Sequence, residues 1–305
     1  ALVDLKRRVE PDKDPPAWQP RPAPSPRRLL SDSIADQMAR PLRMVRSAPQ
    51  MMLDPSPAID TVTNALRTAG NFLNKPEPTI WNQPVSPHRR WVHADVSMEL
   101  AREIKEQRSV TLNDVVLAAC SGALRDFMLE HGESVTDREL KAMVPVSLRN
   151  DDERGDTLGN RVSLIVVDLP IDEPDPLNRL TAIHATTSEL KGSGLADGAQ
   201  AIIEFADGIT PLAPMLTRVV TRSIPMNLVI TNIPGPPIPL YLRRARFLRV
   251  FPYVEVIDNE GLTIAVVSYE DQLHFGITAD RDVMPDLGDV AASIEHEFSG
   301  LVTRH

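Results

Sequence analysis

A buried strand that stops at a proline-rich turn is the feature that most constrains the fold of this chain. The apolar run Leu228-Val229-Ile230 leads directly into Thr231-Asn232-Ile233-Pro234-Gly235-Pro236-Pro237. Proline lacks the N–H that a sheet ladder needs and glycine weakens strands, so the strand ends here and the backbone turns. A rigid loop that presents Asn232 at a strand end is suited to a binding site. A proline-rich strand exit without any chemistry is the alternative interpretation.

The composition is that of a folded, acidic protein. Of the 305 residues 42% are hydrophobic, which is enough for a packed core in one large domain or two ordinary ones. A net charge of -9 argues against nucleic acid as a partner, because such a partner calls for a basic face. The single cysteine, Cys120, excludes an intrachain disulfide framework and fits a reducing cytoplasm. Cys120 lies in an apolar helical run, so we expect an inert core thiol.

Prolines divide the chain into three expected parts. Residues 11–26 hold seven prolines, so residues 1–30 are predicted to form an extended linker. Residues 31–88 are predicted to be a helical connector, and residues 89–305 a compact α/β lobe. One face of the connector helix carries Ile34, Met38, Leu42 and Val45. This face fits either a helix on a lipid surface or an ordinary helix packed on the protein.

Hydrophobic periodicity predicts a mixed arrangement of strands and helices in the lobe. Strands are predicted at residues 91–96, 142–148, 162–169, 226–231, 247–256, 262–269 and 272–278. Helices are predicted at residues 97–107, 111–130, 176–191, 199–206, 211–223 and 286–302. Because strands and helices do not alternate strictly, we expect a mixed β-sheet flanked by helices.

Several common catalytic motifs are absent from the sequence. There is no phosphate-binding loop, no Gly-x-Ser-x-Gly elbow and no Cys-x-x-Cys pair. The seven histidines are scattered without a metal-ligand spacing, so no metal is expected. His274 faces the opposite side of its strand from Leu273 and Phe275. It is predicted to be an exposed or hydrogen-bonded strand histidine rather than a catalytic base.

A polar cluster precedes the longest apolar helix. Thr111-Leu112-Asn113-Asp114 has the spacing of a capping box, in which the Thr111 and Asp114 side chains satisfy free N–H groups. Capping leaves Asn113 without an assigned role. A polar pair at a helix N-terminus also suits the orientation of a partner element or a thioester carbonyl. Both interpretations stay open at this point.

Several blocks of sequence together resemble the bacterial wax ester synthase/diacylglycerol acyltransferase family. The match covers most of residues 76–305, and the proline-rich start resembles the segment that links the two halves of the family. The blocks are Thr111-Leu112-Asn113-Asp114, Met143-Val144-Pro145-Val146-Ser147, Gly159-Asn160-Arg161-Val162, Asn232-Ile233-Pro234-Gly235-Pro236 and Gln272-Leu273-His274-Phe275-Gly276.

The resemblance implies a fold like that of chloramphenicol acetyltransferase, with two α/β lobes and a tunnel between them. It implies transfer of an acyl group from acyl-CoA, as a substrate, to diacylglycerol or a long-chain alcohol, without a cofactor. It also implies supporting catalytic roles for Asn113 and Asp114. The residues expected to bind substrate are Asn232, Pro234, Gly235, Pro236 and Ile238.

The catalytic base of that family lies in a His-His-x-x-x-Asp-Gly motif of the first lobe, and this chain departs from it. No two histidines are adjacent, and Ala1-Leu2-Val3-Asp4 is followed by Leu5 rather than glycine. The chain therefore resembles the second lobe with its linker, and it needs a first lobe as a partner. The expected location is the cytoplasm, with room for peripheral contact with a membrane or lipid inclusion. A non-catalytic lobe that binds lipid or a partner is the alternative.

Overall fold

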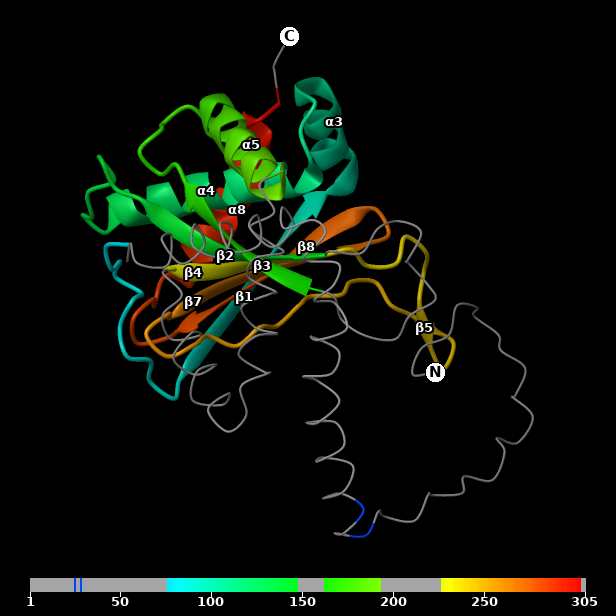
Figure 1. Cartoon of the computed structure of the whole chain (residues 1–305). Coiled ribbons are helices and arrows are strands. Elements are labelled where there is room, and N and C mark those ends of the chain that lie inside the picture. Colours follow the sequence, from blue (N-terminus) through cyan, green and yellow to red (C-terminus); the bar gives the residue numbers. More distant parts are fainter. Residues whose placement is uncertain (1–24, 26–27, 29–75, 148–161, 193–225, 303–305) are drawn as a thin grey trace.

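A six-stranded mixed sheet is the frame of the computed structural model (Figure 1), which describes residues 25, 28, 76–147, 162–192 and 226–302. The strands are β1 (Arg89–Ser97), β2 (Leu140–Ser147), β3 (Val162–Leu169), β4 (Leu228–Ile233), β7 (Leu262–Tyr269) and β8 (Gln272–Asp280). Their order is β1-β8-β7-β4-β2-β3. β2, β4 and β7 run parallel, and the other pairings are antiparallel. The parallel strands therefore all end at the same edge of the sheet.

The described helices cover one face of this sheet (Figure 1). They are α3 (Met98–Arg108), α4 (Leu112–Glu130), α5 (Pro176–Gly192) and α8 (Leu287–Gly300). Alternate strand residues point into the core beneath them, as Leu273, Phe275 and Ile277 do on β8. α4 packs against α3, α5 and α8, which explains why its residues 115–124 are buried without a polar face. Cys120 is among them, and burial raises the pKa of its thiol to about 12, as an inert core thiol requires.

A buried ion pair joins α5 to α8 across α4. The Arg179 guanidinium donates to the Glu297 carboxylate, and both side chains are almost completely buried. Gly122 of α4 lies directly beneath this pair, where an added Cβ would lie 2.2 Å from Glu297 Cδ. Only glycine therefore lets the three helices approach so closely.

The segment that precedes β1 is part of the compact body. Trp81 is fully buried, and its Nε1 donates to the Asn227 carbonyl at 3.0 Å. Asn227 in turn donates to the Glu77 carbonyl at 2.9 Å and accepts from the Lys141 amide at 2.8 Å. Compact structure thus begins before Arg89, within residues that composition alone assigns to the connector.

Most predicted elements of the described regions are confirmed, with boundaries within about two residues. Ser97 caps α3 as predicted, since its side chain accepts from the Leu100 amide. The predicted strand at residues 247–256 is wrong, because this segment lies outside the sheet without strand pairing. A short hairpin of β5 (Tyr241–Leu242) and β6 (Ala245–Arg246) precedes it. The connector helix and the helices predicted at residues 199–206 and 211–223 lie outside the described residues.

The hairpin escapes sequence prediction because its turn contains no glycine. Arg243 and Arg244 adopt positive φ angles of 47° and 75°, a conformation that usually favours glycine or asparagine. None of the helices in the described regions has the length and apolar character that a bilayer crossing requires.

Candidate functional site

Two of the predicted site segments lie at the same edge of the sheet. The loop after α4 leads into the start of β2, so α4 runs antiparallel to β2 and begins where the parallel strands end (Figure 1). Asn113 and Asp114 are in the first turn of α4, and the proline-rich turn follows β4 at this edge. No hydrogen bond joins the two segments within the described part of the chain.

Asp114 is a fully buried carboxylate with three hydrogen-bond donors around it. Its Oδ2 accepts from the Thr111 amide at 2.9 Å and from His184 Nδ1 at 2.8 Å. Its Oδ1 accepts from the Thr187 hydroxyl at 2.7 Å. The Thr111 hydroxyl accepts from the Asp114 amide at 3.3 Å, so the predicted capping box is confirmed. The carboxylate therefore caps α4 and also ties it to α5.

These hydrogen bonds keep the Asp114 carboxylate charged despite its burial. Burial alone would raise the pKa of Asp114, but hydrogen bonds from His184, Thr187 and Thr111 outweigh it and leave the pKa below 3.8. The positive end of the α4 helix dipole favours the same charge. Asp114 is therefore an anchor rather than an acid or base near neutral pH.

His184 and Thr187 are site residues that sequence reasoning missed. They are three residues apart on α5, so both face α4. The His184 side chain is 37% exposed, and its Nε2 makes no hydrogen bond within the described residues. The spacing of a histidine and a threonine on one helix face was available as a signal, but their partner lies about seventy residues earlier in the chain.

Asn113 lies beside Asp114 but takes no part in the capping. It is half-buried, and its side-chain amide makes no hydrogen bond within the described regions. An amide offers both donors and an acceptor, and burial without a partner is costly. The Asn113 amide is thus free to contact a ligand or another part of the protein.

The proline-rich turn is fastened to the turn between β7 and β8. The Gly235 amide donates to the Ser268 hydroxyl at 2.9 Å, and the Glu270 amide donates to the Pro236 carbonyl at 3.2 Å. A Cβ at Gly235 would lie 1.9 Å from the Ser268 carbonyl oxygen, so glycine is required there. Pro234 and Ile238 are exposed, and Asn232 is half-buried on the helix-bearing face. The turn is rigid and open at its tip.

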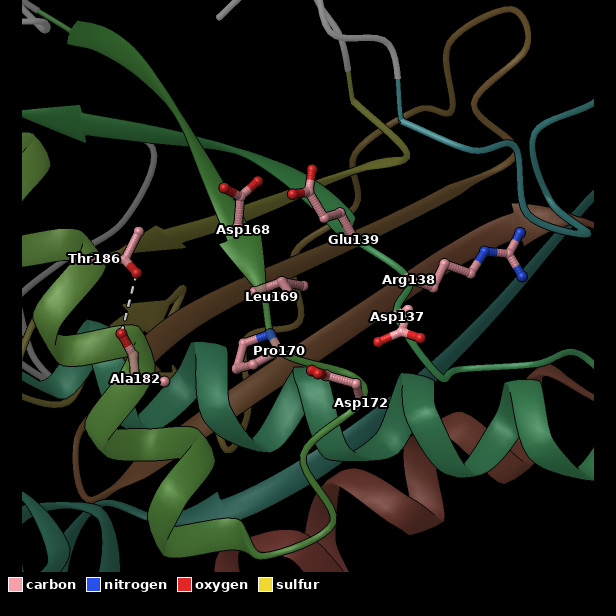
Figure 2. A pocket seen from close by; sticks show the side chains of 9 residues that line it. All are labelled: Asp137, Arg138, Glu139, Asp168, Leu169, Pro170, Asp172, Ala182 and Thr186. Carbon is pink, nitrogen blue, oxygen red and sulfur yellow. Dashed lines mark hydrogen bonds between the residues drawn. The ribbon is translucent and has the colours of Figure 1, made fainter.

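A cavity lies at the opposite edge of the sheet. Its volume is about 370 Å³, and Figure 2 shows it between the start of β2, the end of β3 and α5. It is lined by Asp137, Arg138, Glu139, Asp168, Leu169, Pro170, Asp172, Ala182 and Thr186. Asp168 is already paired with Lys141 at 2.8 Å, and Arg138 with Glu133 at 2.6 Å. None of the predicted site residues lines this cavity.

Two family models match the chain. One, described as the wax ester synthase/diacylglycerol acyltransferase catalytic domain, matches residues 2–116. The other, described as the WS/DGAT C-terminal domain, matches residues 158–301.

Curated relatives agree with these models. The chain is 34% identical over 233 residues to the O-acyltransferase WSD of Acinetobacter baylyi, which is 74% of this chain and 50% of that protein. It is 31% identical over 287 residues to the putative diacyglycerol O-acyltransferase Rv1760 of Mycobacterium tuberculosis, and the match covers 88% of this chain and 56% of that protein. The chain therefore spans about half the length of the curated relatives it matches.

Solved structures confirm the expected fold. The wax ester synthase/diacylglycerol acyltransferase from Marinobacter aquaeolei VT8 is similar with a TM-score of 0.60 at 25% identity, over 79% of this chain and 56% of that one. The starter condensation domain of the rhizomide synthetase RzmA is similar with a TM-score of 0.52 at 14% identity, over 85% and 55%. The chloramphenicol acetyltransferase-like lobe predicted from the sequence is thus confirmed.

The geometry predicts that Asp114 contributes more to stability than capping alone. Thr111→Ala removes one helix cap and is expected to lower the free energy of unfolding by about 1 kcal/mol. Asp114→Ala also leaves His184 and Thr187 without their acceptor, so a cost of about 3 kcal/mol is expected. Denaturant unfolding of both variants at pH 7 measures the difference.

Acid provides the control for this prediction. A depressed folded-state pKa means that the carboxylate stabilises the protein above pH 3.8 and that this contribution is lost as the pH falls below it. The difference in the free energy of unfolding between the wild type and Asp114→Ala should therefore become smaller below that pH. Equal costs for the two variants at pH 7 would show that the contacts to α5 contribute nothing.

Proposed function

Because the chain belongs to the wax ester synthase/diacylglycerol acyltransferase family, we propose that it is the C-terminal half of an acyltransferase. The complete enzyme would move a fatty acyl group from acyl-CoA to diacylglycerol or to a long-chain alcohol. The observation that carries the proposal is the meeting of two family-specific blocks at one sheet edge. Asn113-Asp114 opens α4 there, and residues 232–236 follow the end of β4.

Each block has a separate proposed role. Asp114 fixes the first turn of α4 against α5, and this places the unpartnered Asn113 amide at the edge. Asn113 would then orient a thioester carbonyl or a group of the first lobe. The stiff turn that includes Asn232, Pro234, Gly235, Pro236 and Ile238 would line the acceptor end of the acyl tunnel, because a wall that keeps its shape costs little ordering on binding.

The catalytic base is expected on a first lobe that carries the His-His-x-x-x-Asp-Gly motif. Residues 233–257 offer a surface for such a partner, because they concentrate large exposed apolar side chains. These are Ile233, Ile238, Leu242, Leu248, Tyr253 and Ile257. Diacylglycerol and long-chain alcohols are insoluble in water. We therefore propose that the enzyme acts in the cytoplasm, at the surface of a membrane or lipid inclusion.

The proposal predicts that acyl transfer requires both lobes. The 305-residue chain alone should transfer no acyl group above background, because its sequence lacks the His-His-x-x-x-Asp-Gly motif that supplies the family's base for the acceptor hydroxyl. Addition of a first lobe with the histidine motif should restore transfer from radiolabelled palmitoyl-CoA to hexadecanol or dioleoylglycerol. In the restored enzyme, Asn113→Ala should lower kcat while the melting temperature stays unchanged.

The same experiment separates the alternative function. A first lobe that binds the chain without any turnover would favour a non-catalytic lobe that binds lipid or a partner. Full kcat for Asn113→Ala together with earlier melting would make Asn113 a structural residue.

The turn after β4 is predicted to set alcohol preference. Ile238→Trp leaves less room in the proposed apolar tunnel. Each methylene of the alcohol that is buried there contributes about 0.8 kcal/mol to the binding free energy. In the restored enzyme the preferred alcohol should become shorter, whereas the acyl-CoA preference should stay the same. Leu129→Trp, at an exposed site on α4, is the matched control. An unchanged alcohol profile, or equal shifts for both substrates, would reduce this loop to a simple turn.

A further inference from the structure

The face of the sheet opposite the helices is crossed by a segment that we call the strap, residues 247–256. Side chains rather than a backbone ladder hold it in place. The Tyr269 hydroxyl donates to the Phe247 carbonyl at 3.1 Å, and Trp91 Nε1 donates to the Pro252 carbonyl at 3.3 Å. No backbone–backbone hydrogen bond joins residues 248–256 to the sheet within the described part of the chain. Leu248 remains 79% exposed, so the strap is only partly packed.

The strap lies close against the sheet at Gly276. A Cβ on this residue would lie 1.8 Å from the Pro252 carbonyl oxygen and 3.1 Å from Trp91 Nε1. Glycine at this position of β8 therefore lets the strap lie flat on the sheet. A larger residue would have to push the strap away.

A histidine–carboxylate pair lies beneath the strap, two residues from Gly276. His274 of β8 is 1% exposed, and its Nδ1 lies 2.5 Å from Asp95 Oδ1 of β1. The second oxygen of Asp95 pairs with Arg249 of the strap at 3.1 Å. Asp95 thus links the buried histidine and the strap through one carboxylate.

The other ring nitrogen of His274, Nε2, is buried and has no hydrogen-bond partner among the residues that the structure describes. Tyr269 and Phe251 are its aromatic neighbours, with ring centroids 6.4 and 5.0 Å away. The Tyr269 hydroxyl is already used, because it donates to Phe247 and accepts from the Leu240 amide. An unsatisfied buried nitrogen beside a satisfied one calls for an explanation.

The chemistry around Nε2 specifies the group that it would accept. A carboxylate only accepts hydrogen bonds, so Nδ1 carries a proton, and in the neutral form of the imidazole Nε2 is then a bare acceptor. Its partner must therefore be a donor. The neighbouring Arg249 guanidinium disfavours an ammonium group, and the aromatic rings favour a donor on an apolar body. An alcohol meets all three conditions.

We propose that His274 and Asp95 form a binding site for the hydroxyl group of an aliphatic alcohol, which enters when the strap moves away from Gly276. The inference rests on the proposed function in that an alcohol is the acceptor of the reaction. The site involves no covalent step: Nε2 accepts the hydroxyl hydrogen bond, and Asp95 fixes the tautomer that allows it.

The test uses the 305-residue chain with 15N-labelled histidine and the probe 1-hexanol, and 1-methoxyhexane serves as the ligand without a donor. His274→Asn assigns the His274 signals. The Nε2 resonance of His274 should shift saturably with hexanol and stay in place with the ether. Asp95→Asn should abolish the response, because an amide no longer forces the proton onto Nδ1.

Strap variants test the route of entry. If the closed strap is the dominant state, Gly276→Ala should bind hexanol about tenfold more tightly, because the cost of opening has already been met. Arg249→Gln removes the ion pair between the strap and Asp95, so it should also tighten hexanol binding, without altering the packing at Gly276. Gly288→Ala is the matched control, since no atom lies within 4 Å of its Cβ position.

The contradictory results are equally definite. A His274 signal that ignores hexanol in the wild type and in both strap variants would mean that water or nothing occupies Nε2. An equal response to the ether would mean nonspecific apolar binding. Because neither acyl-CoA nor a first lobe is present, these outcomes are independent of whether acyl transfer is ever restored.

Discussion

The described structure depends on a carboxylate that is buried where a helix begins. A charge withdrawn from water is tolerated only when donors replace the lost solvent, and Asp114 has them from Thr111, His184 and Thr187. Two of these donors belong to α5, so the position of α5 is set by the same group that starts α4. The free amide of Asn113 owes its place at the sheet edge to this arrangement.

Polar contacts fasten α5 to the rest of the lobe at two points. Near its start, Arg179 pairs with Glu297 of α8 above Gly122, and one and two turns later His184 and Thr187 reach Asp114. Apolar packing from Leu180 and Ile183 lies between them. Buried ion pairs and hydrogen bonds demand a defined geometry, whereas apolar contacts tolerate sliding. α5 is therefore held in register along α4, which keeps the Asn113 edge fixed.

Local patterns in the sequence predicted much of this architecture. The capping box at Thr111 and Asp114 and the stop of β4 before Pro234 both follow from short-range chemistry. Contacts distant in sequence were invisible: nothing near His184 marks it as a partner of Asp114. Phe247, Phe251 and Val256 are strand-like residues and predict a strand for the strap, yet the strap lies on the sheet without pairing to it. The strap lies flat on the sheet because Gly276 has no side chain in its way. The sequence around residues 247–256 gives no sign of this distant glycine.

The coupling between Asp114 and His184 tests this account most directly. Unfolding free energies of Asp114→Asn, His184→Gln and the double variant at pH 7 form a double-mutant cycle. If the buried carboxylate ties α4 to α5, the two substitutions should be non-additive by about 1–3 kcal/mol. Costs that add within about 0.3–0.5 kcal/mol would show that the two residues contribute independently, and Asp114 would then be only a helix cap.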